Sequence, residues 1–201
     1  MFLFPTQLKF WIAPAIMAIL SIVGYLFEPN ASDLFAYHRI EVASLQIWRL
    51  ITGHLLHTNA AHLGLNLAGF GLLWALHGEY YTPKRFITFF LLCSMLTSIG
   101  IYIFSPQTSG YVGLSGVLHG LFVWGACFDI LNKERTGWLL LIGIAIKLGY
   151  EQLGGDTQAI AELIGASVAV DAHLYGAVNG LILGLVFIVL SAQKSAPDAT
   201  V

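Results

Sequence analysis

Charged side chains are scarce in this chain. Aspartate, glutamate, lysine and arginine make up 10% of its 201 residues, whereas a typical soluble domain contains about 25% of them. Hydrophobic residues make up 57% of the chain. A soluble globular domain of this length is therefore excluded, and the composition indicates a protein embedded in lipid.

Other absences narrow the possible functions. The net charge is −2 and no basic cluster is present, so nucleic acid is not expected as a partner. The only cysteines, Cys93 and Cys127, lie inside apolar runs, and we interpret them as buried free thiols rather than a disulfide or a metal pair. No histidine is followed by glutamate, which excludes the His-Glu-x-x-His motif of metalloproteases. We expect neither a metal nor a cofactor.

Long apolar runs dominate what is present. A membrane-spanning helix needs about 20 mostly apolar residues, and the chain contains six such runs, at 10–27, 60–77, 86–104, 115–131, 137–150 and 172–191. Acidic residues, not a small-residue cleavage site, follow the first run, so we expect a retained helix. The sequence predicts an all-α polytopic membrane protein, with six transmembrane helices in one domain over 1–201 and a disordered polar tail at about 193–201.

The basic residues predict an orientation. One side of the predicted bundle carries most of them, namely Lys9, Lys84, Arg85, Lys133, Arg135 and Lys194. Basic loops face the cytoplasm, so both termini are expected inside. The outer side then carries two segments. We expect segment 28–56 to lie in the membrane–water interface, with Tyr37 and Trp48 as anchors. We expect segment 151–170 to form a mobile loop or a short helix.

Five polar residues are expected at one depth in the membrane. In this orientation the second, fourth and sixth helices all begin on the outer side. His57, His62 and Asn66 lie near the start of the second helix, Ser115 begins the fourth, and His173 begins the sixth. Polar groups at membrane depth are costly, so such a cluster indicates function.

Small residues recur on one face of each of two predicted helices. These faces are formed by Ser115, Gly116, His119 and Gly120 in the fourth helix, and by His173, Gly176, Gly180 and Gly184 in the sixth. Small residues four apart let membrane helices approach closely. Packing of the two faces would bring Ser115 near His173.

A serine and a histidine in contact can carry out acyl transfer. His173 would take the proton of Ser115 as the hydroxyl attacks a peptide carbonyl. His62, Asn66 and the backbone N–H of Ser115 are the candidate donors to the oxyanion. No acidic residue is an obvious partner for His173, since Asp171 is expected in a loop or cap.

The residues together resemble the rhomboid intramembrane serine proteases. The motifs that carry the resemblance are Trp48-Arg49, His57-x4-His62-x3-Asn66, Gly113-x-Ser115-Gly116 and Ala172-His173-x2-Gly176-x3-Gly180. They agree in order, spacing and helix over about 130 residues.

The resemblance implies roles for these residues. It implies Ser115 as nucleophile, His173 as base, and an oxyanion hole of His62, Asn66 and the Ser115 amide. It also implies supporting positions, namely Gly113, Gly116, His57, His119, Gly176 and Gly180. A lateral or loop-gated entry for substrate is implied as well. His119 departs from the family, which often has tyrosine there, stacked on the catalytic histidine.

A branch of the family is also indicated. The short chain and the stretch Gly-Leu-Ser-Gly-Val-Leu-His-Gly at 113–120 look like the rhombosortases. That resemblance implies a multi-pass protein of the bacterial inner membrane, with its active site facing the periplasm. Its partners would be membrane lipid and transmembrane protein substrates, which for this branch carry C-terminal Gly-Gly sorting tails.

Other functions account for fewer residues. A haem-binding electron carrier could use the histidines but would leave Ser115 and Asn66 without a role. A substrate-binding protein without catalysis would not need both Ser115 and His173. A transporter would explain Lys147 and Glu151, four residues apart, but we prefer to interpret them as a mutually satisfied ion pair near the outer helix end. An α/β-hydrolase elbow would need glycine at Val117.

Overall fold

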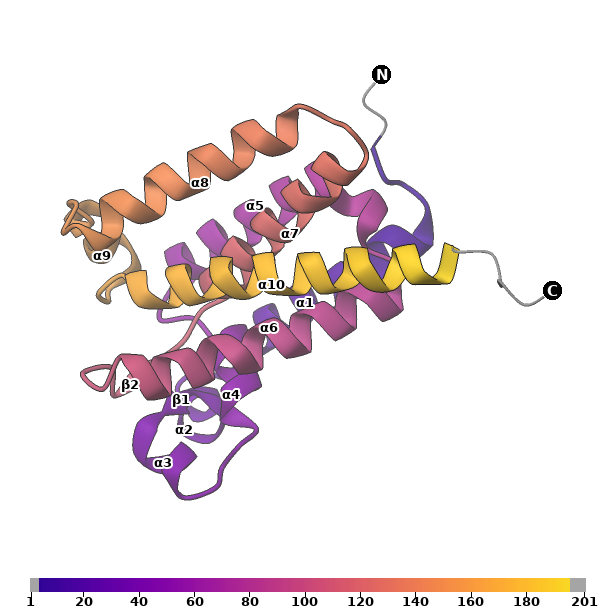
Figure 1. Cartoon of the computed structure of the whole chain (residues 1–201). Coiled ribbons are helices and arrows are strands. Elements are labelled where there is room, and N and C mark those ends of the chain that lie inside the picture. The colour runs from indigo at the N-terminus through magenta and orange to yellow at the C-terminus, as the bar shows by residue number, and fades with distance from the viewer. Residues whose placement is uncertain (1–3, 196–201) are drawn as a thin grey trace.

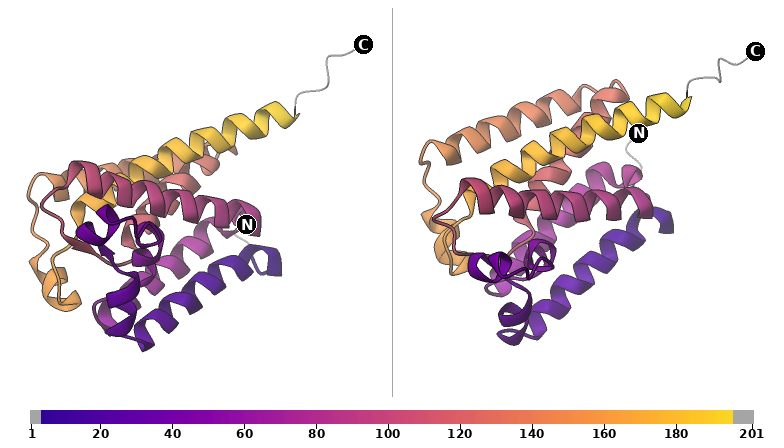
Figure 2. Two further views of the ribbon diagram at one scale, coloured as in Figure 1. Left: turned by 90° about the horizontal axis from the view of Figure 1, so that it is seen from below. Right: turned by 60° about the horizontal axis from the view of Figure 1, so that its bottom comes forward.

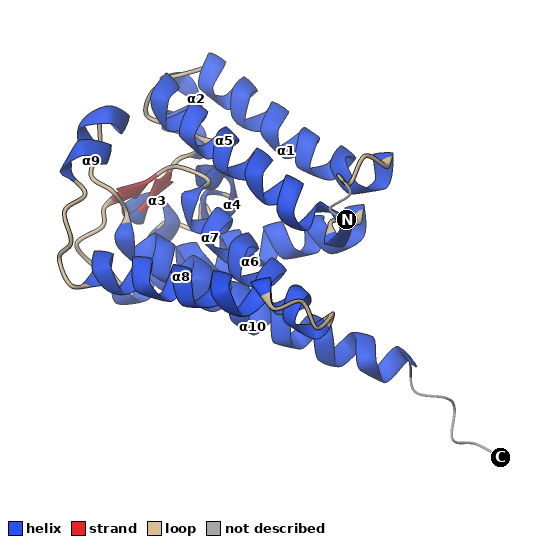
Figure 3. Cartoon of the chain, turned by 90° about the horizontal axis from the view of Figure 1, so that it is seen from above, coloured by secondary structure: helices blue, strands red, loops and turns tan. Residues whose placement is uncertain are grey.

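The computed structural model describes residues 4–195, of which 191–195 are described by their backbone alone. The elements are α1 (Leu8–Leu26), α2 (Asn30–Phe35), β1 (Tyr37–His38), α3 (Arg39–Ala43), α4 (Arg49–Thr52), η1 (Gly53–Leu55), α5 (Ala60–His77), η2 (Gly78–Tyr80), α6 (Pro83–Phe104), β2 (Gly110–Tyr111), α7 (Ser115–Leu131), α8 (Thr136–Gln152), α9 (Gln158–Ile164) and α10 (Val170–Ser195). The described chain is therefore mostly helical, with one short strand pair (Figure 3).

Each of the six apolar runs forms one long helix. Local chemistry fixes where several of them begin. The Asn59 side chain accepts a hydrogen bond from the backbone N–H of His62 at 2.8 Å and caps α5, and Pro83 occupies the first turn of α6. By length and composition, α1, α6 and α10 could each cross a membrane, and α7 is a shorter apolar helix. The predicted polar tail begins inside α10, because that helix continues to Ser195; residues 196–201 lie outside the described part.

Helix α7 lies in the middle of the bundle (Figure 1). It packs against α5, α6, α8 and most extensively against α10. Its Trp124 is fully buried among Phe89, Phe128 and Tyr81, with ring centroids 5.0 to 5.8 Å apart. A helix that is apolar on all sides belongs inside a bundle. The outer helices instead expose large apolar side chains, as expected of surfaces that face lipid.

Glycines of α7 and α10 meet, as the spacing of the two faces predicts. A Cβ added to Gly176 would overlap the backbone of Gly116, and one added to Gly180 would overlap the backbone of Gly120. The two helices are therefore in backbone contact at these points. Because Ser115 and His173 each lie within a turn of this contact, it controls how far apart they are.

Segment 27–56 is a compact layer of short elements beside the bundle. Its β1 pairs antiparallel with β2, with Tyr37 opposite Tyr111. The Arg39 guanidinium donates to three carbonyls at the end of α6, those of Ile101, Tyr102 and Ser105, at 2.8 to 2.9 Å. The layer is thereby fastened to α6.

Only one of the two predicted anchor residues faces outward. Trp48 is exposed and donates through its indole N–H to the Leu34 carbonyl at 3.1 Å. Tyr37 is fully buried against Ile101 and Tyr111, so its assignment as an interfacial anchor is wrong. The sequence pattern could not reveal the two-residue strand that turns Tyr37 inward.

The starts of α5, α7 and α10 lie at one end of the bundle. Helix α9, part of the segment expected as a loop or short helix, lies at that same end (Figure 2). The beginning of α1 and the last turns of α10 lie at the opposite end (Figure 1). The three helix starts that carry the predicted polar residues are therefore neighbours.

The glycine contact gives a test of stability. Gly176→Ala should destabilise the folded protein by about 1–3 kcal/mol, the usual cost of forcing extra atoms into a packed interior. Gly143→Ala on α8 is the control, because a Cβ there meets nothing within 4 Å. Thermal unfolding in detergent should show a lower Tm for Gly176→Ala only. Equal Tm values for the two variants would contradict the close backbone contact.

Candidate active site

Ser115 is the first residue of α7, and the turn before it is held in place. Gly113 has a φ of +122°, a conformation that glycine adopts readily and other residues rarely do. Its backbone N–H donates to the Gly53 carbonyl at 3.1 Å, and its carbonyl accepts from the Tyr111 hydroxyl at 2.7 Å. The hydroxyl of Ser115 is thus presented from a fixed loop at a helix start.

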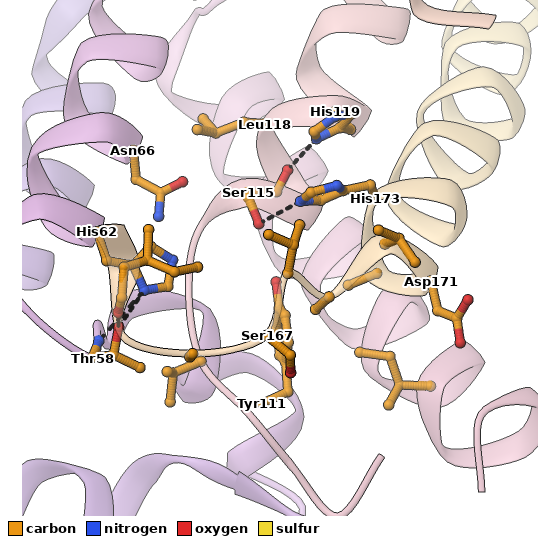
Figure 4. Close-up of a pocket in the computed structure, with 18 of the residues that line it drawn as sticks. Thr58, His62, Asn66, Tyr111, Ser115, Leu118, His119, Ser167, Asp171 and His173 are labelled. Carbon is orange, nitrogen blue, oxygen red and sulfur yellow. Dashed lines mark hydrogen bonds between the residues drawn. The ribbon is translucent and has the colours of Figure 1, made fainter. Parts of the chain in front are cut away.

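His173 contacts Ser115 directly. Its Nε2 lies 3.0 Å from the Oγ of Ser115, and the residue is only 6% exposed. Figure 4 shows the imidazole edge facing the serine hydroxyl, with the two side chains coming from different helices. This is hydrogen-bonding distance for a nucleophile and its base.

His62 and Asn66 lie across the cavity from this pair (Figure 4). They are one turn apart on α5, and both are buried. A Cβ added to Gly113 would lie 2.7 Å from the Nε2 of His62 and 3.6 Å from the Nδ2 of Asn66. Both nitrogens therefore face the loop that leads into Ser115.

The amide nitrogen of Asn66 has no hydrogen-bond partner in the described structure, although Asn66 is only 5% exposed. A buried donor without a partner is costly. An acceptor that arrives with a substrate would relieve that cost, which makes Asn66 a candidate binding group.

These residues line one cavity of about 760 Å³. Part of its wall comes from the segment that follows α9, including Ser167 and Val168. The hydroxyl of Thr58 donates to the Ile164 carbonyl at 2.5 Å and lies 3.0 Å from the Nδ1 of His62. The segment after α9 is thereby tied to the start of α5, on the far side of the cavity from His173.

The His119 ring lies parallel to the ring of His173. Their centroids are 4.1 Å apart and their planes differ by 14°, so His119 stacks on His173. Its Nδ1 lies 2.7 Å from the carbonyl oxygen of Ser115. Since a carbonyl only accepts, Nδ1 carries the proton and His119 is fixed in one tautomer.

Glu151, which the sequence did not connect with the site, faces the other edge of His173. Its Oε2 is 3.0 Å from the Nδ1 of His173. The predicted ion pair is also present, with the Nζ of Lys147 2.8 Å from Glu151. Helix α8 extends to Gln152, past the apolar run that ends at residue 150, so Glu151 lies in its last turn. The sequence did hold one indication of this contact, because Glu151 is an ionisable residue expected near the outer end of its helix, as His173 is.

Two other predicted residues lie beside the site. Asp171 points away from His173, and its carboxylate accepts from the Ser105 hydroxyl at 2.5 Å, which links the start of α10 to the end of α6. The His57 ring stands edge-on to His62 at a centroid distance of 5.0 Å. Asp171 therefore links two helix ends, and His57 contacts the oxyanion-hole candidate His62.

A second serine–histidine pair lies in the interior. The Nε2 of His54 is 3.0 Å from the Oγ of Ser98 and 3.0 Å from the Ser94 carbonyl. Both His54 and Ser98 are 0% exposed, and neither lines the cavity. This pair connects η1 to α6, and no substrate can reach it in this conformation.

His119, Glu151 and His173 also have the composition of a metal site. Their ligand atoms lie within 4.8 Å of one another. The Nζ of Lys147, however, lies 2.6 Å from His119, 2.8 Å from Glu151 and 3.2 Å from His173. The ammonium group holds the position that a metal ion would need. The geometry therefore favours an internal ion pair over a metal centre.

Helices of this length and apolarity, with large apolar side chains exposed on the outside of the bundle, define an integral membrane protein. Residues 44–190 match the Rhomboid domain, and the chain belongs to the rhomboid family. This range contains each of the site residues named above.

Three relatives illustrate the similarity. Rhomboid protease GlpG of Haemophilus influenzae is 24% identical over 181 residues, which cover 85% of this chain and 88% of the relative. Putative rhomboid protease YdcA of Bacillus subtilis is 25% identical over 157 residues, covering 75% and 72%. Rhomboid protease GluP of Bacillus subtilis is 30% identical over 130 residues, covering 60% of this chain and 25% of that relative.

The conspicuous Trp48-Arg49 pair lies outside the cavity. The Arg49 guanidinium is buried and donates to the Ala36 carbonyl at 2.7 Å and the Asp33 carbonyl at 2.8 Å. Arg49 therefore organises the layer of short helices, which in turn supplies β1 as the partner of β2 next to the Ser115 loop.

Proposed function

We propose that this chain is an intramembrane serine endopeptidase, with Ser115 as nucleophile and His173 as general base. The observation that carries the proposal is the 3.0 Å contact between the Ser115 Oγ and the His173 Nε2, at the wall of a cavity large enough for a peptide segment. The named activity of the rhomboid relatives supports the same reaction.

The reaction proceeds by acyl transfer. As Oγ attacks the substrate carbonyl, its proton passes to Nε2 of His173, and the C–N bond then breaks as that proton moves to the leaving amine. Water attacks the resulting ester, aided by the same histidine, and restores the Ser115 hydroxyl. Apart from the substrate itself, only the dyad and water change their bonding.

Charge develops on the carbonyl oxygen during attack. The candidate donors are the Ser115 backbone N–H, which as the first of a helix lacks an intrahelical partner, and the side chains of His62 and Asn66. The unpartnered Nδ2 of Asn66 supports this role, because a donor without a ground-state partner is available for the oxyanion.

We further propose that the site faces the periplasm of a bacterial inner membrane and that both termini are cytoplasmic. The lysine and arginine distribution supports this orientation. The cavity is lined by residues at the starts of α5, α7 and α10, the end of the bundle that this orientation would place outside. A six-span topology follows if α5, α7 and α8 also cross the membrane.

The two serine–histidine pairs give the first test. Ser115→Ala and His173→Ala should each lower cleavage of a transmembrane reporter by at least about 10³-fold, since each removes half of the dyad. Ser98→Ala is the matched control and should keep cleavage at the wild-type level. Thermal unfolding verifies that all three variants fold. Activity lost in Ser98→Ala but kept in Ser115→Ala would move the nucleophile to the other pair.

Asn66 tests the oxyanion assignment. Asn66→Ala should lower kcat by about 10²–10³-fold, the usual effect of losing one oxyanion donor, while KM changes little. Steady-state kinetics on a reporter in detergent separates the two parameters. An unchanged kcat would remove Asn66 from the oxyanion hole.

The substrates are proposed to be transmembrane proteins with C-terminal Gly-Gly sorting tails, as in the rhombosortase branch. Glycine pairs let an extended or unwound backbone reach the serine without side-chain clashes. A reporter that carries the Gly-Gly tail should be cleaved at least about tenfold faster than one with Leu-Leu, a ratio worth about 1.4 kcal/mol. Equal rates would exclude tail selection but not proteolysis.

A further inference from the structure

A connected polar network lies behind His173, on the side away from Ser115. Lys147 and Glu151 are one turn apart on α8, and the Nζ of Lys147 contacts Glu151, His119 and His173 within 3.2 Å. The carboxylate of Glu151 is 7% exposed and the Lys147 side chain 40% exposed. Neither residue lines the cavity, so neither is expected to touch substrate.

Two groups compete for the Nδ1 of His173. The Glu151 carboxylate, at 3.0 Å, can only accept a proton from Nδ1. The Lys147 ammonium, at 3.2 Å, can only donate one. A neutral imidazole carries one proton. If Glu151 prevails, the proton is on Nδ1 and Nε2 is free to accept from Ser115; if Lys147 prevails, Nε2 is protonated and cannot act as a base.

His119 directs the outcome of this competition. Because its Nδ1–H donates to the Ser115 carbonyl, its Nε2 is an acceptor, and the ammonium of Lys147 lies 2.6 Å away. Lys147 can therefore donate to His119 and Glu151 while leaving His173 to the carboxylate. The pairing with Lys147 also compensates the charge of Glu151, whose burial would otherwise be unfavourable.

We infer that Glu151 is a positioning residue for His173, and that Lys147 and His119 keep its carboxylate in place. The network fixes the imidazole in the tautomer that the base requires. This inference rests on the proposed serine protease function and adds a third member to the dyad.

A purely structural ion pair is the alternative. Lys147 and Glu151 could serve only to fasten the end of α8 to α10. In that case their loss would lower stability and affect all kinetic parameters through misfolding. The inference predicts instead a specific loss of kcat, together with a change in the protonation of His173.

The test uses the full-length protein in detergent with Glu151→Gln, Lys147→Met and the double variant. Glu151→Gln should lower kcat by at least about 10²-fold with KM nearly unchanged; the corresponding amide substitution in a soluble triad lowers kcat about 10⁴-fold through the wrong tautomer. In Glu151→Gln the amide oxygen would accept a hydrogen bond from the Lys147 ammonium, which leaves the NH₂ group to donate to the Nδ1 of His173. The double variant should have a kcat at least about tenfold higher than Glu151→Gln alone, because without Lys147 the glutamine oxygen is free to accept a hydrogen bond from Nδ1.

Three controls accompany these variants. Glu162→Gln removes an exposed carboxylate on the neighbouring α9, where it accepts from Gln158 at 2.8 Å, and should leave kcat unchanged. Glu151→Asp keeps a carboxylate and should retain more activity than Glu151→Gln. Nitrogen-15 NMR of labelled histidine should show His173 protonated at Nδ1 in the wild type and at Nε2 in Glu151→Gln.

The outcomes separate this inference from the proposed function. If Ser115→Ala still cleaves, the protease mechanism itself is wrong. If Ser115→Ala is inactive but folded Glu151→Gln keeps wild-type kcat and the same His173 tautomer, only the role of Glu151 is overturned. If the variants and the double variant lose activity and Tm in parallel, with no rescue, the ion pair is structural and the inference fails.

Discussion

The backbone contact between α7 and α10 is the constraint on which the site depends. Glycines 116 and 120 of α7 meet glycines 176 and 180 of α10 with no room for side chains. In lipid, two apolar helices gain little by leaving hydrocarbon, so dispersion contacts between closely approaching backbones provide much of their association. The same approach brings the first turns of the two helices together. Ser115 and His173 lie in those turns, and their 3.0 Å separation follows from the contact.

The site also shows how a membrane protein keeps polar groups at a tolerable cost. Unpaired charges in a low-dielectric interior are strongly unfavourable. Here the carboxylate of Glu151 is shared by His173 and Lys147, and the ammonium of Lys147 is shared by Glu151 and His119. Some buried polar atoms nevertheless lack a hydrogen-bond partner within the described structure, among them the ring nitrogens of His57 and the Nδ2 of Asn66. Of these two residues, Asn66 is the one that lines the cavity. A site for a substrate carbonyl needs a hydrogen-bond donor that the protein itself does not already occupy, and the Asn66 amide meets that requirement.

The long helices, and the gathering of the polar residues at one end of the bundle, could be predicted from the sequence, because both follow from local pattern. Apolar runs define the helices, and the glycine spacing on α7 and α10 predicts which faces meet. The stacking of His119 on His173 was one of the possibilities that its position four residues after Ser115 left open. Glu151 was missed because its relation to His173 depends on how α8 is rotated about its axis, which an almost uniformly apolar helix does not reveal. Tyr37 was misassigned for a related reason, since a two-residue strand pairing leaves no periodic signal.

The two serine–histidine pairs show why contact alone does not identify a catalytic site. Both have an Nε2–Oγ distance of 3.0 Å. In the His54–Ser98 pair, the histidine nitrogen is also 3.0 Å from the Ser94 carbonyl, which only accepts, so Nε2 is a donor and cannot take the serine proton. In the His173–Ser115 pair, no carbonyl of the residues that the structure describes competes for Nε2, while a carboxylate faces Nδ1 and favours protonation there. Ser115 also begins a helix and borders the cavity, whereas Ser98 lies within α6. The group opposite each imidazole nitrogen therefore distinguishes a base from a structural hydrogen bond.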